Sequence, residues 1–186
     1  METQNTNKDE KTAKYKLTSE TTQWFGETLY RIQALKDFKG VSKGEKGGFI
    51  LKKENLSQEG DAWVSGDARV FDNAWVSGNA KIFDNAWVFG NAWVSGDARV
   101  SGDAWVSGNA RVFGNAWVFG NAQIFDNAWV SGDARASGDA RVSGDARVFG
   151  KLKLSIGFFF GMQYKNEKIK KIKTDNGNYI LWKEQI

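Results

Sequence analysis

Tryptophan and arginine recur at one position of a six-residue unit that the sequence repeats without a gap. Residues 60–77 read GDAWVSGDARVFDNAWVS, and the unit continues to residue 149. An indole ring and a guanidinium group attract each other when stacked, and both residue types are enriched at binding hot spots. The chemistry that this pattern offers is therefore stacking and recognition. The candidate interaction residues are Trp63, Trp75, Trp87, Trp93, Trp105, Trp117, Trp129, Arg99, Arg111, Arg135, Arg141 and Arg147.

Few residues in this sequence are of the types that take part in catalysis. It contains no histidine and no cysteine, so the commonest general base and the commonest metal ligands are absent. A carboxylate acts as a base at neutral pH only if burial raises its pKa, and we expect the repeated aspartates to be solvated. We therefore expect no enzyme, no catalytic residue and no cofactor.

The regular aspartates and asparagines raise the question of calcium, which prefers oxygen ligands. The calcium-binding β-roll repeats every nine residues with its own glycine spacing, whereas this array repeats every six. Asp and Asn also tolerate tight turns and bond to nearby backbone. Where Asp takes the first corner position, at Asp72, Asp84 and Asp126, Asn always follows, which keeps carboxylates apart. We expect turn residues here and no metal site.

The repeat itself predicts the fold. Fifteen hexads of the form [Gly/Asp]-[Asp/Asn]-Ala-x-[Val/Ile]-[Ser/Phe] fill residues 60–149, and Ala136 is the only break at the Val/Ile position. On an extended segment Ala and Val point to one side and x to the other, while the next two positions favour a turn. The sequence therefore predicts an all-β coil with strands stacked about 4.8 Å apart.

Runs such as VFGNAWVFGNAQIF, residues 112–125, resemble the hexapeptide-repeat left-handed β-helix. The resemblance implies a left-handed parallel β-helix shaped as a triangular prism, with three hexads per coil and about five coils, roughly 24 Å of rod. The lead-in GEKGGFILKKENLSQEGDAWV, together with the array, resembles prophage-encoded YdcK-like hexapeptide-repeat proteins, a group with no established activity. Acyltransferases of the hexapeptide fold use a histidine base, which is absent here.

Three columns of outward residues follow from that geometry, one on each face of the prism. Stacked Trp and Arg side chains could cover one another and need no partner. The amount of aromatic surface argues instead for a binding partner, because it exceeds what a monomer usually exposes. The columns are Trp63, Lys81, Arg99, Trp117 and Arg135; Arg69, Trp87, Trp105, Gln123 and Arg141; and Trp75, Trp93, Arg111, Trp129 and Arg147.

The flanks predict caps at both ends of the rod, because an open β-helix exposes unpaired edges. Tyr15 to Leu35 alternates polar and apolar residues around Phe25-Gly26-Glu27, which predicts a hairpin, and 169–182 predicts a second hairpin turning at Asp175-Asn176-Gly177. The expected organisation is a disordered segment at 1–13, an N-terminal β cap at 14–59, the β-helix at 60–155 and a C-terminal β-hairpin or meander cap at 156–186.

Charge and hydropathy place the protein in solution. The array has ten Asp against six Arg and Lys81, a net charge of −3, so the flanks carry +7. The N-terminus lacks the apolar stretch of a signal peptide, and no run is long enough to span a bilayer. We expect a cytoplasmic protein that does not enter membranes.

These observations favour a non-catalytic, rigid interaction module that binds a host protein or itself, as a dimer or trimer, through its Trp, Arg and Phe columns. The resemblance adds a phage or prophage origin and, with it, the hypothesis of an inhibitor of a host defence factor. Two alternatives remain: a divergent hexapeptide acyltransferase-like protein, and a single-stranded nucleic-acid binder. Nucleic acid ranks below a protein partner because acidic corners flank the Arg columns.

Overall fold

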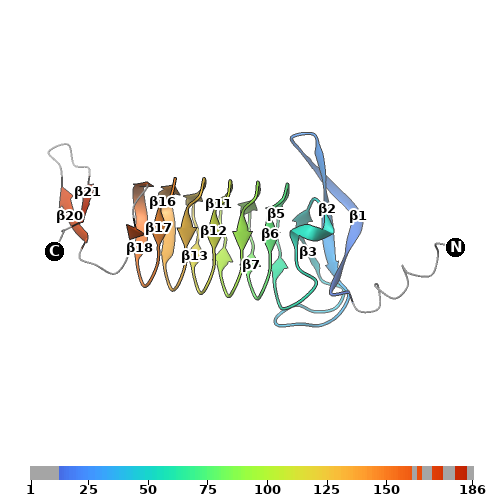
Figure 1. Cartoon of the computed structure of the whole chain (residues 1–186). Helices are drawn as coiled ribbons and strands as arrows, with labels where there is room; N and C mark the ends of the chain where they lie inside the picture. The colour runs from blue at the N-terminus through green and yellow to red at the C-terminus, as the bar shows by residue number, and fades with distance from the viewer. Residues whose placement is uncertain (1–12, 161–162, 165–168, 174–178, 184–186) are drawn as a thin grey trace.

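The computed structural model describes residues 13–160, 163–164, 169–173 and 179–183. They form a parallel β-solenoid of about six turns that rises along the chain from a β-hairpin at one end (Figure 1). This confirms the predicted all-β parallel architecture. The expected disorder of residues 1–13 falls almost wholly on residues outside the described ones.

The strands alternate with bends at the six-residue period. The N-terminal elements are β1 (Tyr15–Trp24), β2 (Glu27–Ala34), β3 (Lys46–Ile50) and the 3-10 turn η1 (Lys53–Asn55). The array contains β4 (Trp63–Val64), β5 (Arg69–Val70), β6 (Trp75–Val76), β7 (Lys81–Ile82), β8 (Trp87–Val88), β9 (Trp93–Val94), β10 (Arg99–Val100), β11 (Trp105–Val106), β12 (Arg111–Val112), β13 (Trp117–Val118), β14 (Gln123–Ile124), β15 (Trp129–Val130), β16 (Arg135–Ser143) and β17 (Arg147–Val148). Then follow β18 (Lys153–Phe160), β19 (Gln163–Tyr164), β20 (Ile169–Lys173) and β21 (Tyr179–Lys183).

Each strand from β4 to β15 pairs in parallel with the strand eighteen residues later, which defines three faces. The first face contains β4, β7, β10, β13 and the start of β16; the second contains β3, β5, β8, β11, β14 and the end of β16. The third contains β6, β9, β12, β15, β17 and β19. Because β3 precedes the array and β18 and β19 follow it in the same pairing, the solenoid is longer than the five coils of the hexads.

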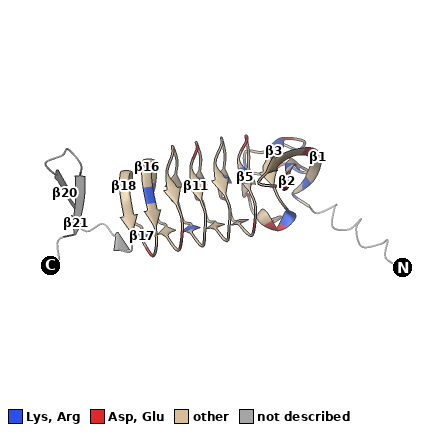
Figure 2. Cartoon of the chain, turned by 90° about the horizontal axis from the view of Figure 1, so that it is seen from above, with Lys and Arg blue, Asp and Glu red and all other residues tan. Residues whose placement is uncertain are grey.

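The core consists of the Ala and Val/Ile positions that the repeat places inward. These side chains are fully buried in every turn of the array, including Ala136, which lies beside Leu154 of the next turn. Acidic residues lie at the bends between strands (Figure 2). At these corners the first residue has a positive φ, which glycine adopts freely and which Asp72, Asp84 and Asp126 also adopt.

The predicted N-terminal hairpin is confirmed, with β1 and β2 antiparallel around Phe25 and Gly26. β3 pairs antiparallel with β2 and parallel with β5, so it joins the hairpin to the solenoid. At the other end β20 pairs antiparallel with β21, as the predicted second hairpin requires. The turn expected at 175–177 lies outside the described residues.

Lys14 ties the hairpin to the first turn. Its buried ammonium donates hydrogen bonds to the carbonyl oxygens of Ala62 at 2.9 Å, Gly60 at 3.3 Å and Glu59 at 3.4 Å. Burial lowers the pKa of Lys14 to about 8. Burial also raises the pKa of the neighbouring Tyr15, whose hydroxyl donates to the carbonyls of Lys53 and Leu56.

These shifts predict how stability changes in alkaline solution. Between pH 8 and the ordinary lysine value of 10.5, the unfolded chain binds more protons at Lys14, so the free energy of unfolding rises with pH. Above about pH 10 ionisation of Tyr15 in the unfolded chain opposes this rise. Urea titrations at pH 7.5 and 9.5 should show higher stability at pH 9.5 for wild type and for Lys16→Met. They should show a smaller difference for Lys14→Met, and an undiminished difference would contradict the assignment.

Candidate interaction surface

The three predicted columns are present in the predicted register. On the first face Trp63 pairs with Lys81, and the column continues through Arg99, Trp117 and Arg135. The second and third columns follow the same eighteen-residue rule. Side chains at this slot therefore lie one above another at strand spacing.

The third face is a continuous stack. Trp75 and Trp93 are nearly parallel, with ring centroids 5.3 Å apart and an interplanar angle of 18°. The guanidinium of Arg111 lies between two indoles, 5.7 Å from the Trp93 ring and 5.1 Å from the Trp129 ring. Arg147 then stacks on Trp129 at 4.8 Å. The column covers part of its own aromatic surface, yet Trp75 stays 44% exposed and Trp93 37% exposed.

The second face begins as a similar stack and then stops. Trp24 of the hairpin contacts Trp87 at 4.1 Å, and Arg69 lies near both rings. Trp87 and Trp105 are parallel within 3°, with centroids 5.1 Å apart. The next residue in the column is Gln123, which has no ring, and Trp105 is 40% exposed.

The first face corrects one predicted interaction residue. Trp63 occupies the outward slot, but it is only 2% exposed, because Tyr15 and Phe38 of the N-terminal region pack on it. It is part of the core rather than of the surface. Further along this face Arg135 stacks on Trp117 at 5.5 Å, and Arg99 is exposed.

In several hexads the last residue, Ser or Phe, contacts a tryptophan of the column sixteen positions later. Phe89 contacts Trp105 edge-on, and Phe113 contacts Trp129 in the same way. Where the slot holds serine, the indole N–H donates to its hydroxyl instead, as Trp93 does to Ser77 at 3.3 Å. In these pairs the Phe or Ser position of one turn and the Trp position of the next are therefore coupled.

The corners carry ladders that reading along the chain did not reveal. The amide of each Asn donates to the Asn or Asp one turn later, as from Asn85 to Asp103 at 3.1 Å and from Asn127 to Asp145 at 3.2 Å. Asp72, Asp84 and Asp126 accept the backbone N–H of the glycine one turn later at 3.0–3.1 Å. Reading every eighteenth residue would have found this, because Asp and Asn then alternate along two of the corners.

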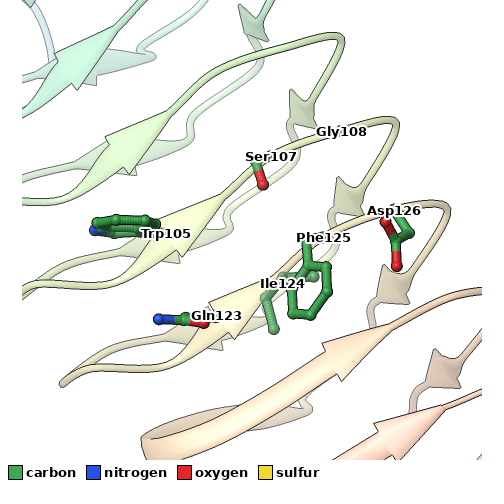
Figure 3. A pocket seen from close by; sticks show the side chains of 7 residues that line it. All are labelled: Trp105, Ser107, Gly108, Gln123, Ile124, Phe125 and Asp126. Atoms are coloured by element: carbon green, nitrogen blue, oxygen red, sulfur yellow. The ribbon is translucent and has the colours of Figure 1, made fainter.

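A hollow opens on the second face where the aromatic column stops. It has a volume of about 240 Å³ and lies between Trp105 and the next turn (Figure 3). Gln123 and Ser107 line it with side chains that have no ring, while Phe125 and Asp126 lie on the side nearer the corner. A smaller hollow of about 200 Å³ adjoins Trp93, Arg111 and Trp129 on the third face.

Two further observations concern the described part of the chain alone. There, no three acidic residues, histidines or cysteines converge in a way that could hold a metal ion. No helix among these residues has the length and apolar character needed to cross a membrane.

Comparison with known families agrees with the repeat and its fold. The family model described as the YdcK beta solenoid repeat matches four segments, residues 62–79, 92–108, 104–120 and 122–138. No curated protein matches the chain. The protein is thus a parallel β-solenoid whose repeats are similar to the YdcK beta solenoid repeat.

Proposed function

We propose that this protein is a non-catalytic, rigid interaction module that binds a protein, either a partner or a second copy, through its outward Trp, Arg and Phe columns. The observation that carries the proposal is the exposure that remains after stacking. Trp75, Trp93 and Trp105 each keep more than a third of their surface exposed although each packs against a neighbouring indole. Such residues are typical of binding hot spots.

The backbone supports this role because it holds the columns in place before binding. Every turn of the array donates backbone hydrogen bonds to the next, for example from Trp93 N–H to the Ala110 carbonyl at 2.9 Å. Stacking then limits the rotamers of the outward side chains. A preorganised surface loses little conformational entropy on binding.

A protein partner fits the charges better than nucleic acid does. The Arg columns lie between corners that carry exposed carboxylates, such as Asp97, Asp103 and Asp139. These carboxylates accept hydrogen bonds from the Asn ladders, and they would repel a phosphate backbone that followed the columns.

The resemblance to prophage-encoded proteins adds an origin and a biological role to the proposal. We propose a phage-encoded protein that acts in the cytoplasm of the host and blocks a host factor, such as a component of a defence system. The rigid rod would act by occupying a surface of that factor, which requires no catalytic group.

The test compares single faces of the rod. Tagged wild type and the variants Trp75→Lys/Trp93→Lys (third face), Trp105→Lys (second face) and Arg99→Glu (first face) are expressed in the bacterial host, crosslinked and purified. We expect a specific protein, or a second copy of this chain, to be retained by wild type and lost with one face only. Identical recovery with all variants that remain folded by circular dichroism would contradict the proposal.

A further inference from the structure

The second face contains a gap in an otherwise continuous aromatic surface. Phe71 and Phe89 stack at 5.0 Å in the corner column, and Phe89 meets Trp105 edge-on. The next corner residue is Ser107, and the column residue that packs below Trp105 is Gln123. Both rings of the usual Phe–Trp pair are therefore missing at one place, which creates the hollow beside Trp105.

The same face then exposes the side chains that could fill such a gap. Arg141 follows Gln123 in the column and Phe158 follows Arg141, while Phe160 follows Ser143 at the corner. Phe158 is 60% exposed and Phe160 is 64% exposed. Within the described residues, the guanidinium of Arg141 stacks on no ring and pairs with no carboxylate, unlike Arg69, Arg111, Arg135 and Arg147, which stack on tryptophans.

We infer that the second face binds a second copy of this chain, packed antiparallel about a two-fold axis. The axis runs along the strands, midway between the turns of Gln123 and Arg141. This inference rests on the proposed function and names the partner of one face. The rotation places Trp105 against Phe158 of the other copy, Ser107 against Phe160 and Gln123 against Arg141. Each contact occurs twice, as an isologous interface requires.

Size complementarity carries this arrangement. Ser107, the small residue beside the hollow, meets the exposed ring of Phe160 in each half of the interface. Ser143 is buried within its own chain, and Phe125 meets the ring of Phe158 of its own chain edge-on at 6.2 Å, so this corner adds no second pair. A small side chain therefore faces a large one at two places that the axis relates. A parallel packing about an axis along the rod would instead set Ser107 against Ser107 and leave the hollow empty.

Charge complementarity points the same way. Arg141 of the second copy enters the hollow between the free side of the Trp105 ring and the carboxylate of Asp126, whose Oδ2 accepts the Gly144 N–H at 3.1 Å. The third face shows that a guanidinium fits this kind of slot, because Arg111 packs against the Trp93 ring one turn earlier. Each Arg141 lies opposite Gln123 of the other copy, beside the hollow that Asp126 also lines.

Sedimentation velocity on the full chain tests the proposal. We expect wild type to form a dimer, twice 20.7 kDa, in the micromolar range. Gln123→Trp should raise the dissociation constant by about tenfold or more, because the new ring fills the hollow from within its own chain. It should keep the fold, since it extends a stack that already exists. Arg141→Glu should weaken the dimer by a similar factor. Arg99→Glu, which changes an exposed arginine on the first face, should leave it unchanged.

Crosslinking decides the orientation, and the absence of native cysteine makes each introduced thiol unique. A mixture of Ser107→Cys and Phe160→Cys chains should form a covalent dimer with a short bismaleimide, because packed sheets lie about 10 Å apart. Ser107→Cys alone should not. Crosslinking of Ser107→Cys to itself, or a monomer at every concentration, would overturn the antiparallel dimer. The recovery of a host protein with the single-face variants is measured independently of this result. If the protein is a monomer but one face variant fails to retain a host protein that wild type retains, the antiparallel dimer is wrong and the proposed function still holds.

Discussion

Trp63→Ala is expected to lower the free energy of unfolding by about 3–5 kcal/mol, the usual cost of removing a large aromatic side chain from a core. Trp63 is 2% exposed and packs against Tyr15 and Phe38, with ring centroids 6.4 Å and 5.3 Å away. Its loss should therefore loosen the N-terminal cap as well as the first turn. Urea denaturation followed by far-UV circular dichroism measures the change.

Trp93→Ala provides the matched control, because Trp93 holds the same slot of the hexad five hexads further along and on another face. It is 37% exposed and keeps one stacked neighbour on each side. The expected loss is about 1 kcal/mol, the size of an aromatic contact at an exposed site. Equal losses at the two positions would mean that the hairpin does not cover Trp63.

Gly114→Val is the second substitution for which we expect a large effect, a loss of about 3–5 kcal/mol. Gly114 has a φ of +69°, and a Cβ placed there would lie 3.0 Å from the backbone nitrogen of Gly132 in the next turn. A β-branched residue is destabilised both by the left-handed backbone conformation and by the close contact with the next turn. The neighbouring turn cannot move away without breaking its own backbone hydrogen bonds.

Gly114→Asp should cost only about 1 kcal/mol in the same assay. Asp72 already occupies the equivalent corner position with a positive φ. It lies above Gly90 and accepts the Gly90 N–H at 3.0 Å. The new carboxylate should accept the Gly132 N–H in the same way, and the following residue, Asn115, adds no charge. If both variants lost the same stability, the corner hydrogen bond would not be the reason that the sequence accepts Asp there.

The repeat determined most of the solenoid without help from other parts of the chain. Ala and Val/Ile two residues apart, followed by a corner pair, specify which side chains enter the core, and the structure buries these positions throughout. The register of the Trp and Arg columns followed from the same period. When each strand pairs in parallel with the strand eighteen residues later, only one alignment of the Trp and Arg positions is possible. Local patterns suffice when every contact is between neighbouring turns.

The sequence did not determine which outward residues are covered, and here the tertiary structure decided. Trp63 and Trp93 occupy identical slots, but the N-terminal region, which lies far from Trp93, folds over the first turn and buries Trp63. The corner ladders and the hollow beside Trp105 likewise depend on residues eighteen positions apart. A hexad encodes its own strand and corner, whereas burial and gaps at the surface arise from pairs of turns and from the cap.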